Sequence, residues 1–367
     1  FILGIAMANS KHGVGGLTYD TSKRRWPNEA NVFIALIILI LIFEGLGLLT
    51  QGQSFLFDSK DRFDSIFNEQ RLKIIILQVS IIGIIAIGVT QVIISGGIDL
   101  SSGSIVGATA MIAMSFAQVA EVNGRPNPKA IFLEQGWVDL PIIIPILVGL
   151  CCGIVAGGIN GLLIAYTRIP PFIATLGMMV SARGIAKWWS KGRPISFPTD
   201  DFEMIGNGFG GWMPVVIFIS LAILFYLILK YTVYGKHTYA IGSNEDAARM
   251  AGIDVRRHKV LVYAIAGMLA AFAALVLSSK NLTAQSGMGV MYELDAIAMT
   301  VIGGISLAGG RGSIVGTVIG ALIFGVIISG FTFLRLDAYY QEMVKGIIIV
   351  GAVVLDQWRQ RNAATRA

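Results

Sequence analysis

The side chains in this sequence that could contact a solute are few and polar, and they lie in or beside long apolar stretches. The candidates are Asp99, Ser101, Ser102, Asn160 and Thr175. A polar group at membrane depth costs free energy unless it is paired or wet, so these side chains indicate a translocation pathway or gate. Purely structural roles for these side chains remain open as alternatives. Asp99 can instead accept N–H bonds at the start of the next helix, and Asn160 and Thr175 can join neighbouring helices.

Reactive groups are not arranged for catalysis or metal binding. The three histidines are scattered, and no Cys, Asp or Glu stands near them at a metal-ligand spacing. Cys151 and Cys152 are adjacent inside an apolar run, which favours small buried hydrophobes over a reactive pair. A phosphate-binding Gly-x-x-x-x-Gly-Lys-Ser/Thr loop does not occur in the sequence. We therefore expect no catalytic residue, no metal and no cofactor, and any ATP hydrolysis must belong to another protein.

The composition predicts the elements that position these groups. The chain has 367 residues, of which 55% are hydrophobic and 14% charged, whereas a soluble protein carries roughly 25% charged residues. Lipid-facing side chains cannot be ionised cheaply, which accounts for the missing charge. The 44 glycines suit close packing of transmembrane helices. We expect an all-α polytopic membrane protein that lies in a lipid bilayer and binds no nucleic acid.

About ten segments are long and apolar enough to cross a bilayer as helices, which needs roughly 20 residues each. They cover residues 32–49, 72–95, 104–121, 142–166, 172–189, 213–230, 260–279, 291–308, 313–333 and 338–356. The interpretation gives one transmembrane domain over 32–356, with a cytoplasmic segment 1–31 before it and a cytoplasmic tail 357–367 after it.

Basic residues set the expected orientation, because Lys and Arg near span ends are retained in the cytoplasm. If ten spans alternate, the basic clusters fall on one side of the membrane, and both termini are cytoplasmic. These clusters precede the first span, follow the fourth, eighth and tenth spans, and fill the connection 231–259.

The connection 231–259 contains a predicted short helix that could dock on a partner. Asn244 or Ser243 can cap this helix, and Gly252 can end it. Glu245 and Asp246 complement its positive end, and Ala247, Ala248 and Arg249 favour helix. Its small residues would enter a groove of the partner. The alternative is a solvated loop that is helical without a partner.

Several segments resemble, in order along the chain, the permease subunits of the ribose, xylose and galactoside family of ABC importers. They are Val92–Ser104, Gly158–Leu162, Pro171–Gly177, Tyr234–Gly267, Tyr292–Ala298 and Gly303–Ser313. The resemblance implies a homodimer of ten-helix subunits in the bacterial inner membrane, with a cytoplasmic ATP-binding subunit and a periplasmic sugar-binding protein as partners. It also implies that Asn244–Gly252 receives the motion of the ATPase. Residues 1–30 and 123–139 fall outside the resemblance.

The expected function is import of a monosaccharide or polyol, such as ribose, galactose, xylose or inositol, by alternating access. A mildly polar pathway suits a neutral sugar, because tight binding would slow its release. The alternative is an ion-coupled secondary transporter, which needs a membrane-embedded carboxylate. Glu44 and Asp99 are the candidates, whereas Glu342 and Lys345 are one helical turn apart and are expected to pair.

An internal similarity joins two of these segments. Residues 96–107 resemble residues 303–316, and each segment connects two apolar stretches. Two explanations remain open, a structural repeat of the kind that lines transport pathways and the repeated use of Gly and Ser in tight turns.

Overall fold

The structure is a computed structural model that describes residues 28–57, 68–337, 339–348, 350–351 and 354. Its elements are α1 (Asn28–Gln51), α2 (Glu69–Ile94), α3 (Ser102–Ser115), β1 (Glu121–Val122), β2 (Arg125–Pro126), α4 (Ile143–Thr167), α5 (Pro171–Trp189), β3 (Ile195–Ser196), α6 (Asp200–Gly211), α7 (Met213–Tyr231), α8 (Val233–Ser243), α9 (Glu245–Met250), α10 (Val255–Lys280), β4 (Thr283–Ala284), α11 (Tyr292–Ile302) and α12 (Ile314–Phe333). Residues 339–348 are helical as well.

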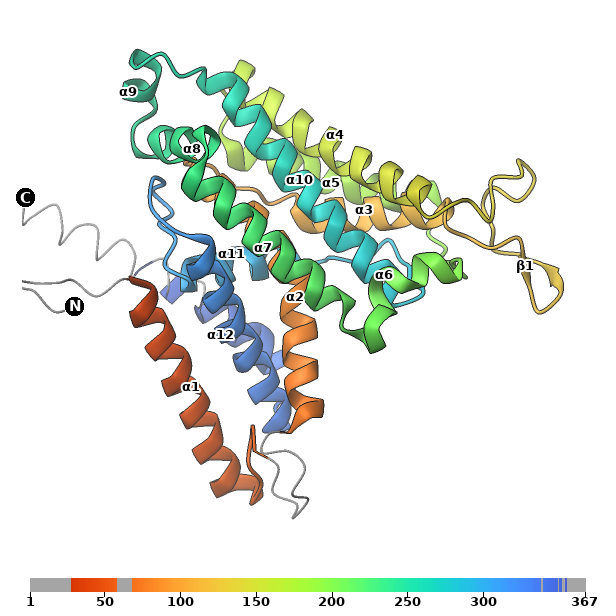
Figure 1. The fold of residues 1–367 in the computed structure, drawn as a ribbon, viewed down its shortest axis with the longest axis horizontal. Coiled ribbons are helices and arrows are strands. Elements are labelled where there is room, and N and C mark those ends of the chain that lie inside the picture. Colours follow the sequence, from red (N-terminus) through yellow and green to blue (C-terminus); the bar gives the residue numbers. More distant parts are fainter. Residues whose placement is uncertain (1–27, 58–67, 338, 349, 352–353, 355–367) are drawn as a thin grey trace, which may run out of the picture.

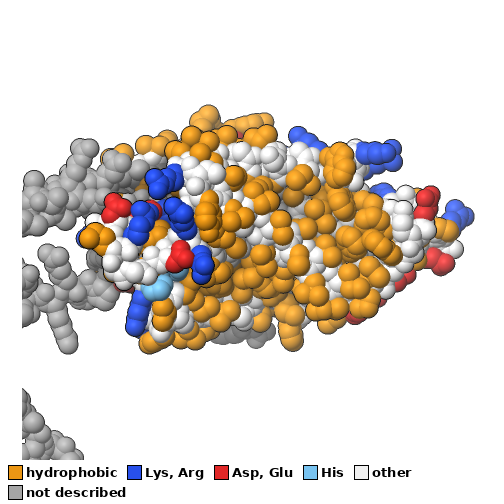
Figure 2. All heavy atoms as spheres, turned by 90° about the horizontal axis from the view of Figure 1, so that it is seen from above, with side chains coloured by type: hydrophobic (Ala, Val, Ile, Leu, Met, Phe, Trp, Pro, Cys, Tyr) orange, Lys and Arg blue, Asp and Glu red, His pale blue; other side chains and the backbone are white. Residues whose placement is uncertain are grey.

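Helices α2 and α10 form the centre of the molecule. Helix α10 packs on α4, α2, α3 and α6, and α2 also packs on α7, α11 and α12. The two-residue strands pair antiparallel, β1 with β2 and β3 with β4. Helices α8 and α9 lie at one end of the long axis and the β1–β2 hairpin at the other (Figure 1). One face is hydrophobic across its middle, with charged side chains towards its two ends, as a bilayer requires (Figure 2).

Six helices in the described residues are long and apolar enough to cross a membrane: α1, α2, α4, α7, α10 and α12. Two of the ten expected spans are helices too short to cross a bilayer. The expected span 104–121 is the 14-residue α3, and the expected span 291–308 is the 11-residue α11. At 1.5 Å per residue these helices reach only about 21 and 16 Å, less than the roughly 30 Å of hydrocarbon. Part of the expected tenth span, 338–356, lies outside the described residues.

Helix α5 has the length of a span but carries Arg183 and Lys187. The expected loop 190–212 contains α6, whose first turn is rich in acidic residues. Apolar composition alone therefore overestimated the number of full-length spans and missed one amphipathic helix.

A glycine stripe on α4 allows its close approach to α10. A Cβ added at Gly157 would lie 2.1 Å from the Tyr263 carbonyl oxygen, and one at Gly153 would lie 2.3 Å from that of Gly267. Both obstacles are backbone atoms, so no side-chain rotation relieves them. Small residues at such positions let two backbones gain dispersion contacts in a membrane, where the hydrophobic effect between helices is absent.

We expect Gly157→Ala to lower the stability of the folded protein by about 1–3 kcal/mol through overpacking of α4 on α10. Gly158→Ala is the matched control, because a Cβ there has no atom within 4 Å. Thermal unfolding in detergent measures both. Equal melting temperatures for the two variants would contradict the close contact between α4 and α10.

Candidate functional site

The candidate site begins with the break between α2 and α3. Helix α2 ends at Ile94, and Gly96 turns the chain with a φ of +82° that an L side chain rarely adopts. Asp99 Oδ1 then accepts hydrogen bonds from the backbone N–H of Ser101 at 2.8 Å and from its hydroxyl at 2.6 Å. Ser101 occupies the N-cap position of α3, but its side chain makes no capping hydrogen bond there. Asp99 therefore shapes the turn before α3 and accepts an N–H bond at the start of that helix, as the alternative interpretation expected.

Three other helices reach the same break. Asn160 of α4 donates its amide to Ser101 Oγ at 2.8 Å. Thr175 of α5 donates to the Ile98 carbonyl oxygen at 3.5 Å, and Tyr263 of α10 donates to that oxygen at 3.4 Å. The structure thus brings Asn160, Thr175 and Asp99 together around residues 98–101. Tyr263 was not recognised from the sequence, because a lone Tyr in an apolar run carries no signal of its own.

The site is closed in this conformation. Asp99 and Ser102 are buried, and Asn160 and Thr175 are fully buried. Within the described part of the chain, Asn160 Oδ1 and Ser102 Oγ are buried without a hydrogen-bond partner. Unpaired buried polar atoms are costly in native proteins, so these two atoms are expected to bond water or another group in some state of the protein. They are suited to accept or donate bonds to hydroxyl groups once the helices separate.

A glycine junction connects this break to the rest of the molecule. The loop before α12 returns to α2, since Gly310 donates its N–H to the Ile94 carbonyl oxygen at 2.8 Å. A Cβ added at Gly242, near the end of α8, would lie 1.7 Å from the Ile94 oxygen and 2.7 Å from Gly310 N. A Cβ at Gly309 would lie 3.1 Å from Gly96. These residues form the glycine junction, defined as Gly96, Gly242, Gly309 and Gly310. A side chain at Gly242, Gly309 or Gly310 would collide with its neighbours, and Gly96 needs glycine for its positive φ.

The two similar segments 96–107 and 303–316 meet in the glycine junction. Each contains a glycine with positive φ directly after a helix, Gly96 at +82° and Gly304 at +87°. Each then starts a new helix, α3 or α12. The local course is alike, but the residue similarity pairs Gly96 with Gly303, one position before Gly304, so the common use of glycine at helix ends explains the likeness as well as a structural repeat does.

Helix α8 is hydrogen-bonded both to α2 and to the loop before α12. The Tyr234 hydroxyl donates to Gln91 Oε1 of α2 at 2.8 Å, and burial raises the pKa of the Tyr234 phenol, so it stays a neutral donor. The Tyr239 hydroxyl donates to the Gly312 carbonyl oxygen at 2.8 Å. A movement of α8 must therefore reach the ends of α2 and α12.

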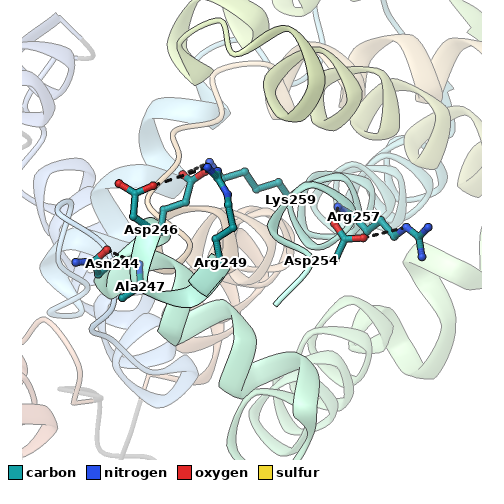
Figure 3. A network of polar contacts seen from close by, with 8 residues as sticks. Asn244, Asp246, Ala247, Arg249, Asp254, Arg257 and Lys259 are labelled. Carbon is teal, nitrogen blue, oxygen red and sulfur yellow. Dashed lines mark hydrogen bonds and ion pairs between the residues drawn. The ribbon is translucent and has the colours of Figure 1, made fainter. Parts of the chain in front are cut away.

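Helix α9 follows α8 directly and matches the predicted short helix. Asn244 is its cap and accepts the Ala247 N–H at 2.9 Å, and Gly252 leaves it with a φ of +88°. Glu245 bonds Arg249 at 2.9 Å and Lys259 of α10 at 2.6 Å, which ties the start of α9 to α10. Figure 3 shows the side chains of Arg249 and Lys259 reaching toward the same point. Arg249 also lies 3.8 Å from Asp246.

The outer face of α9 differs from the sequence expectation at one residue. Ala248, expected among the docking residues, is 4% exposed and packs on Ile241 and Val255 of its own chain. Ala247 is exposed, and Met250 is 90% exposed. The surface available to a partner is therefore centred on Met250, a side chain that adapts to apolar grooves.

The remaining candidates have structural contacts. Glu44 Oε2 accepts the backbone N–H groups of Phe55 at 3.0 Å and Leu56 at 3.1 Å, and Ser54 bonds its other oxygen. The expected Glu342–Lys345 pair is wrong, because Lys345 pairs with Asp295 at 3.1 Å.

Two further expectations concern cysteine and metal. Cys151 is exposed rather than buried, on the outer side of α4. No group of three potential His, Cys, Asp or Glu metal ligands lies together within the described segments.

Comparison with known proteins identifies the family. Residues 71–353 match the family described as "Branched-chain amino acid transport system / permease component". The chain belongs to this family. It is 39% identical over 343 residues to the ribose import permease protein RbsC of Haemophilus influenzae, covering 91% of this chain and 94% of that protein. No solved structure matches.

Two other relatives extend the comparison. The RbsC of Bacillus subtilis is 42% identical over 284 residues, covering 76% of this chain and 82% of that protein. The galactose/methyl galactoside import permease protein MglC of Haemophilus influenzae is 36% identical over 331 residues, covering 88% and 93%. The chain is thus a bacterial, multi-pass permease subunit of an ABC importer. Permeases of this type work with an ATPase and a binding protein, and the ATPase is a separate subunit.

Proposed function

We propose that this permease imports a monosaccharide of the ribose or galactose type and that the solute passes the break between α2 and α3. The names of its relatives support the solute class. The observation that carries the pathway is the convergence of α4, α5 and α10 on residues 98–101, with Asn160 Oδ1 and Ser102 Oγ left unpaired. Neutral hydrogen-bonding groups of this kind can exchange with sugar hydroxyls without holding the sugar tightly.

The same proposal includes the assembly and topology expected from the sequence. Two copies form the complete permease, each places about ten helices in the inner membrane, of which α3 and α11 are too short to cross it, and both termini lie in the cytoplasm. The basic residues around α8 and α9 support a cytoplasmic position for that end. Helix α9 then contacts the ATPase, and the opposite end with the β1–β2 hairpin faces the periplasmic binding protein.

Uptake of radiolabelled ribose and galactose by proteoliposomes that contain the complete importer tests the proposal. We expect ATP-dependent uptake of one of these sugars. Asn160→Leu keeps a branched side chain, although a larger one, and removes the bond to Ser101 and the unpaired oxygen, and it should lower uptake by about tenfold, the equivalent of roughly 1.4 kcal/mol. Ser181→Leu on the exposed side of α5 is the control. Normal uptake by Asn160→Leu would contradict the pathway.

Ion-coupled transport is the second candidate, and the contacts of its two carboxylates decide how to test it. Both oxygens of Glu44 already hold the turn after α1, so of the two carboxylates singled out in the sequence Asp99 is the one to test. Asp99→Asn keeps an acceptor for Ser101 but removes the charge. We expect Asp99→Asn to retain ATP-driven uptake and Asp99→Ala to lose most of it. Uptake driven by an ion gradient without ATP, and abolished in Asp99→Asn, would overturn the ATP-driven mechanism.

A further inference from the structure

A groove runs between α7 and α12 on the surface of the molecule. Its wider part is a cavity of about 910 Å³ that includes Lys230, Lys236 and Ser313. It continues into a cavity of about 290 Å³ lined only by apolar and aromatic residues, among them Ile219, Ile223 and Ile319. Both cavities share Tyr226, Ile314 and Val315, so they form one continuous groove.

The groove is polar at one end and apolar along the rest. Ile219, Ile223 and Val315 are exposed by 50%, 56% and 42%, so the apolar floor is open to the surroundings. The whole groove extends from Lys230 back to Phe218, twelve residues along α7, or about 18 Å, and its purely apolar part from Tyr226 to Phe218 covers about 12 Å of this length. One leaflet of a bilayer contributes roughly half of a 30 Å hydrocarbon core, about 15 Å. The groove therefore has the length of a single acyl layer.

The polar end carries positive charge that no carboxylate neutralises directly. Lys230 Nζ bonds the Tyr226 hydroxyl at 2.6 Å, and in the described residues neither Lys230 nor Lys236 forms an ion pair. Glu29 also lines the cavity, and its Oε1 accepts the Ser313 hydroxyl at 2.9 Å. The two lysines outnumber this single acid, and the positive end of α12 lies beside them.

We propose that this groove binds an anionic phospholipid, with the phosphate between Lys230 and Lys236 and an acyl chain along Ile219, Ile223 and Ile319. Charge complementarity and the one-leaflet length select this occupant. The segment before α1 contains Lys23, Arg24 and Arg25 and does not complement the lysines. The leaflet on the α9 side is the cytoplasmic one, and on that point alone the inference rests on the proposed function.

Native mass spectrometry of the purified permease in detergent tests the inference independently of transport. The probes are phosphatidylglycerol and phosphatidylcholine added at equal concentrations. We expect the wild-type chain to retain phosphatidylglycerol preferentially. Lys230→Gln combined with Lys236→Gln should weaken that retention by about 30-fold, the order expected for two lysine contacts with an anionic headgroup. Lys187→Gln combined with Lys191→Gln removes two exposed lysines outside the groove and should leave retention unchanged.

A second pair of variants tests the apolar part. Ile319→Trp fills the smaller cavity and should also lower phosphatidylglycerol retention, whereas Leu162→Trp on the exposed side of α4 should not. Equal retention of the two lipids, or equal losses in the two lysine pairs, would overturn the proposal. A change in the monomer–dimer ratio of Ile319→Trp with lipid retention intact would also overturn it, because a second copy of the chain would then be the occupant.

Discussion

Replacing Gly242 by alanine is expected to reduce sugar uptake to background. The added Cβ would lie 1.7 Å from the Ile94 carbonyl oxygen, which also accepts the Gly310 N–H. Because both neighbours are backbone, α8 must move away from the end of α2 and from the loop before α12. The glycine junction places the end of α8, which leads directly into α9, against the end of α2 that precedes the Asp99 turn, so its separation should disconnect the ATPase from the pathway.

The measurement distinguishes lost coupling from lost folding. Thermal unfolding of Gly242→Ala should show a loss of about 1–3 kcal/mol, as for other overpacked sites, with the chain still folded at growth temperature. ATP hydrolysis by the complete importer should no longer respond to the sugar-loaded binding protein. Gly177→Ala is the control, since a Cβ at Gly177 has no atom within 4 Å. A Gly242→Ala importer with normal uptake would show that the junction does not transmit motion.

The positions of most long helices could be predicted from the sequence, because apolar runs of the right length have few alternatives in a membrane chain. Helix α4 was expected over 142–166 and lies over Ile143–Thr167, and α7 was expected over 213–230 and lies over Met213–Tyr231. The errors occurred where apolar residues continue past a helix end. After Ser115 the chain remains largely apolar to residue 120, yet the helix stops at Ser115.

The polar residues of the candidate site could be selected from the sequence, but their arrangement could not. Asp99, Asn160 and Thr175 are separated by up to 76 positions along the chain, and only the tertiary packing of α4 and α5 brings them to residues 98–101. Gly242 gave no signal, since a glycine near a helix end is common. The burial of Ala248 could not be predicted either, because helical spacing shows which residues share a face but not which face packs on the protein's own core.

Replacing Met250 on the exposed side of α9 by glutamate is expected to reduce sugar uptake strongly. If Met250 enters an apolar groove of the ATPase, a glutamate there would bury an unpaired charge, which costs several kcal/mol. We expect uptake and stimulated ATP hydrolysis of the complete importer to fall by about 30-fold or more, the effect of losing a central interface residue. The isolated permease should unfold at its normal temperature, because Met250 is 90% exposed.

Two comparison variants separate docking from folding in α9. Met204→Glu changes another exposed methionine, on α6, and should leave uptake normal. Ala248→Glu should lower the melting temperature of the permease itself, because that side chain packs on Ile241 and Val255. A loss of uptake without a loss of stability in Met250→Glu, together with a loss of stability in Ala248→Glu, would show that Met250 faces the partner and that Ala248 faces the permease. Normal ATPase stimulation in Met250→Glu would show that α9 does not contact the ATPase, because Met250 is the most exposed apolar side chain of that helix.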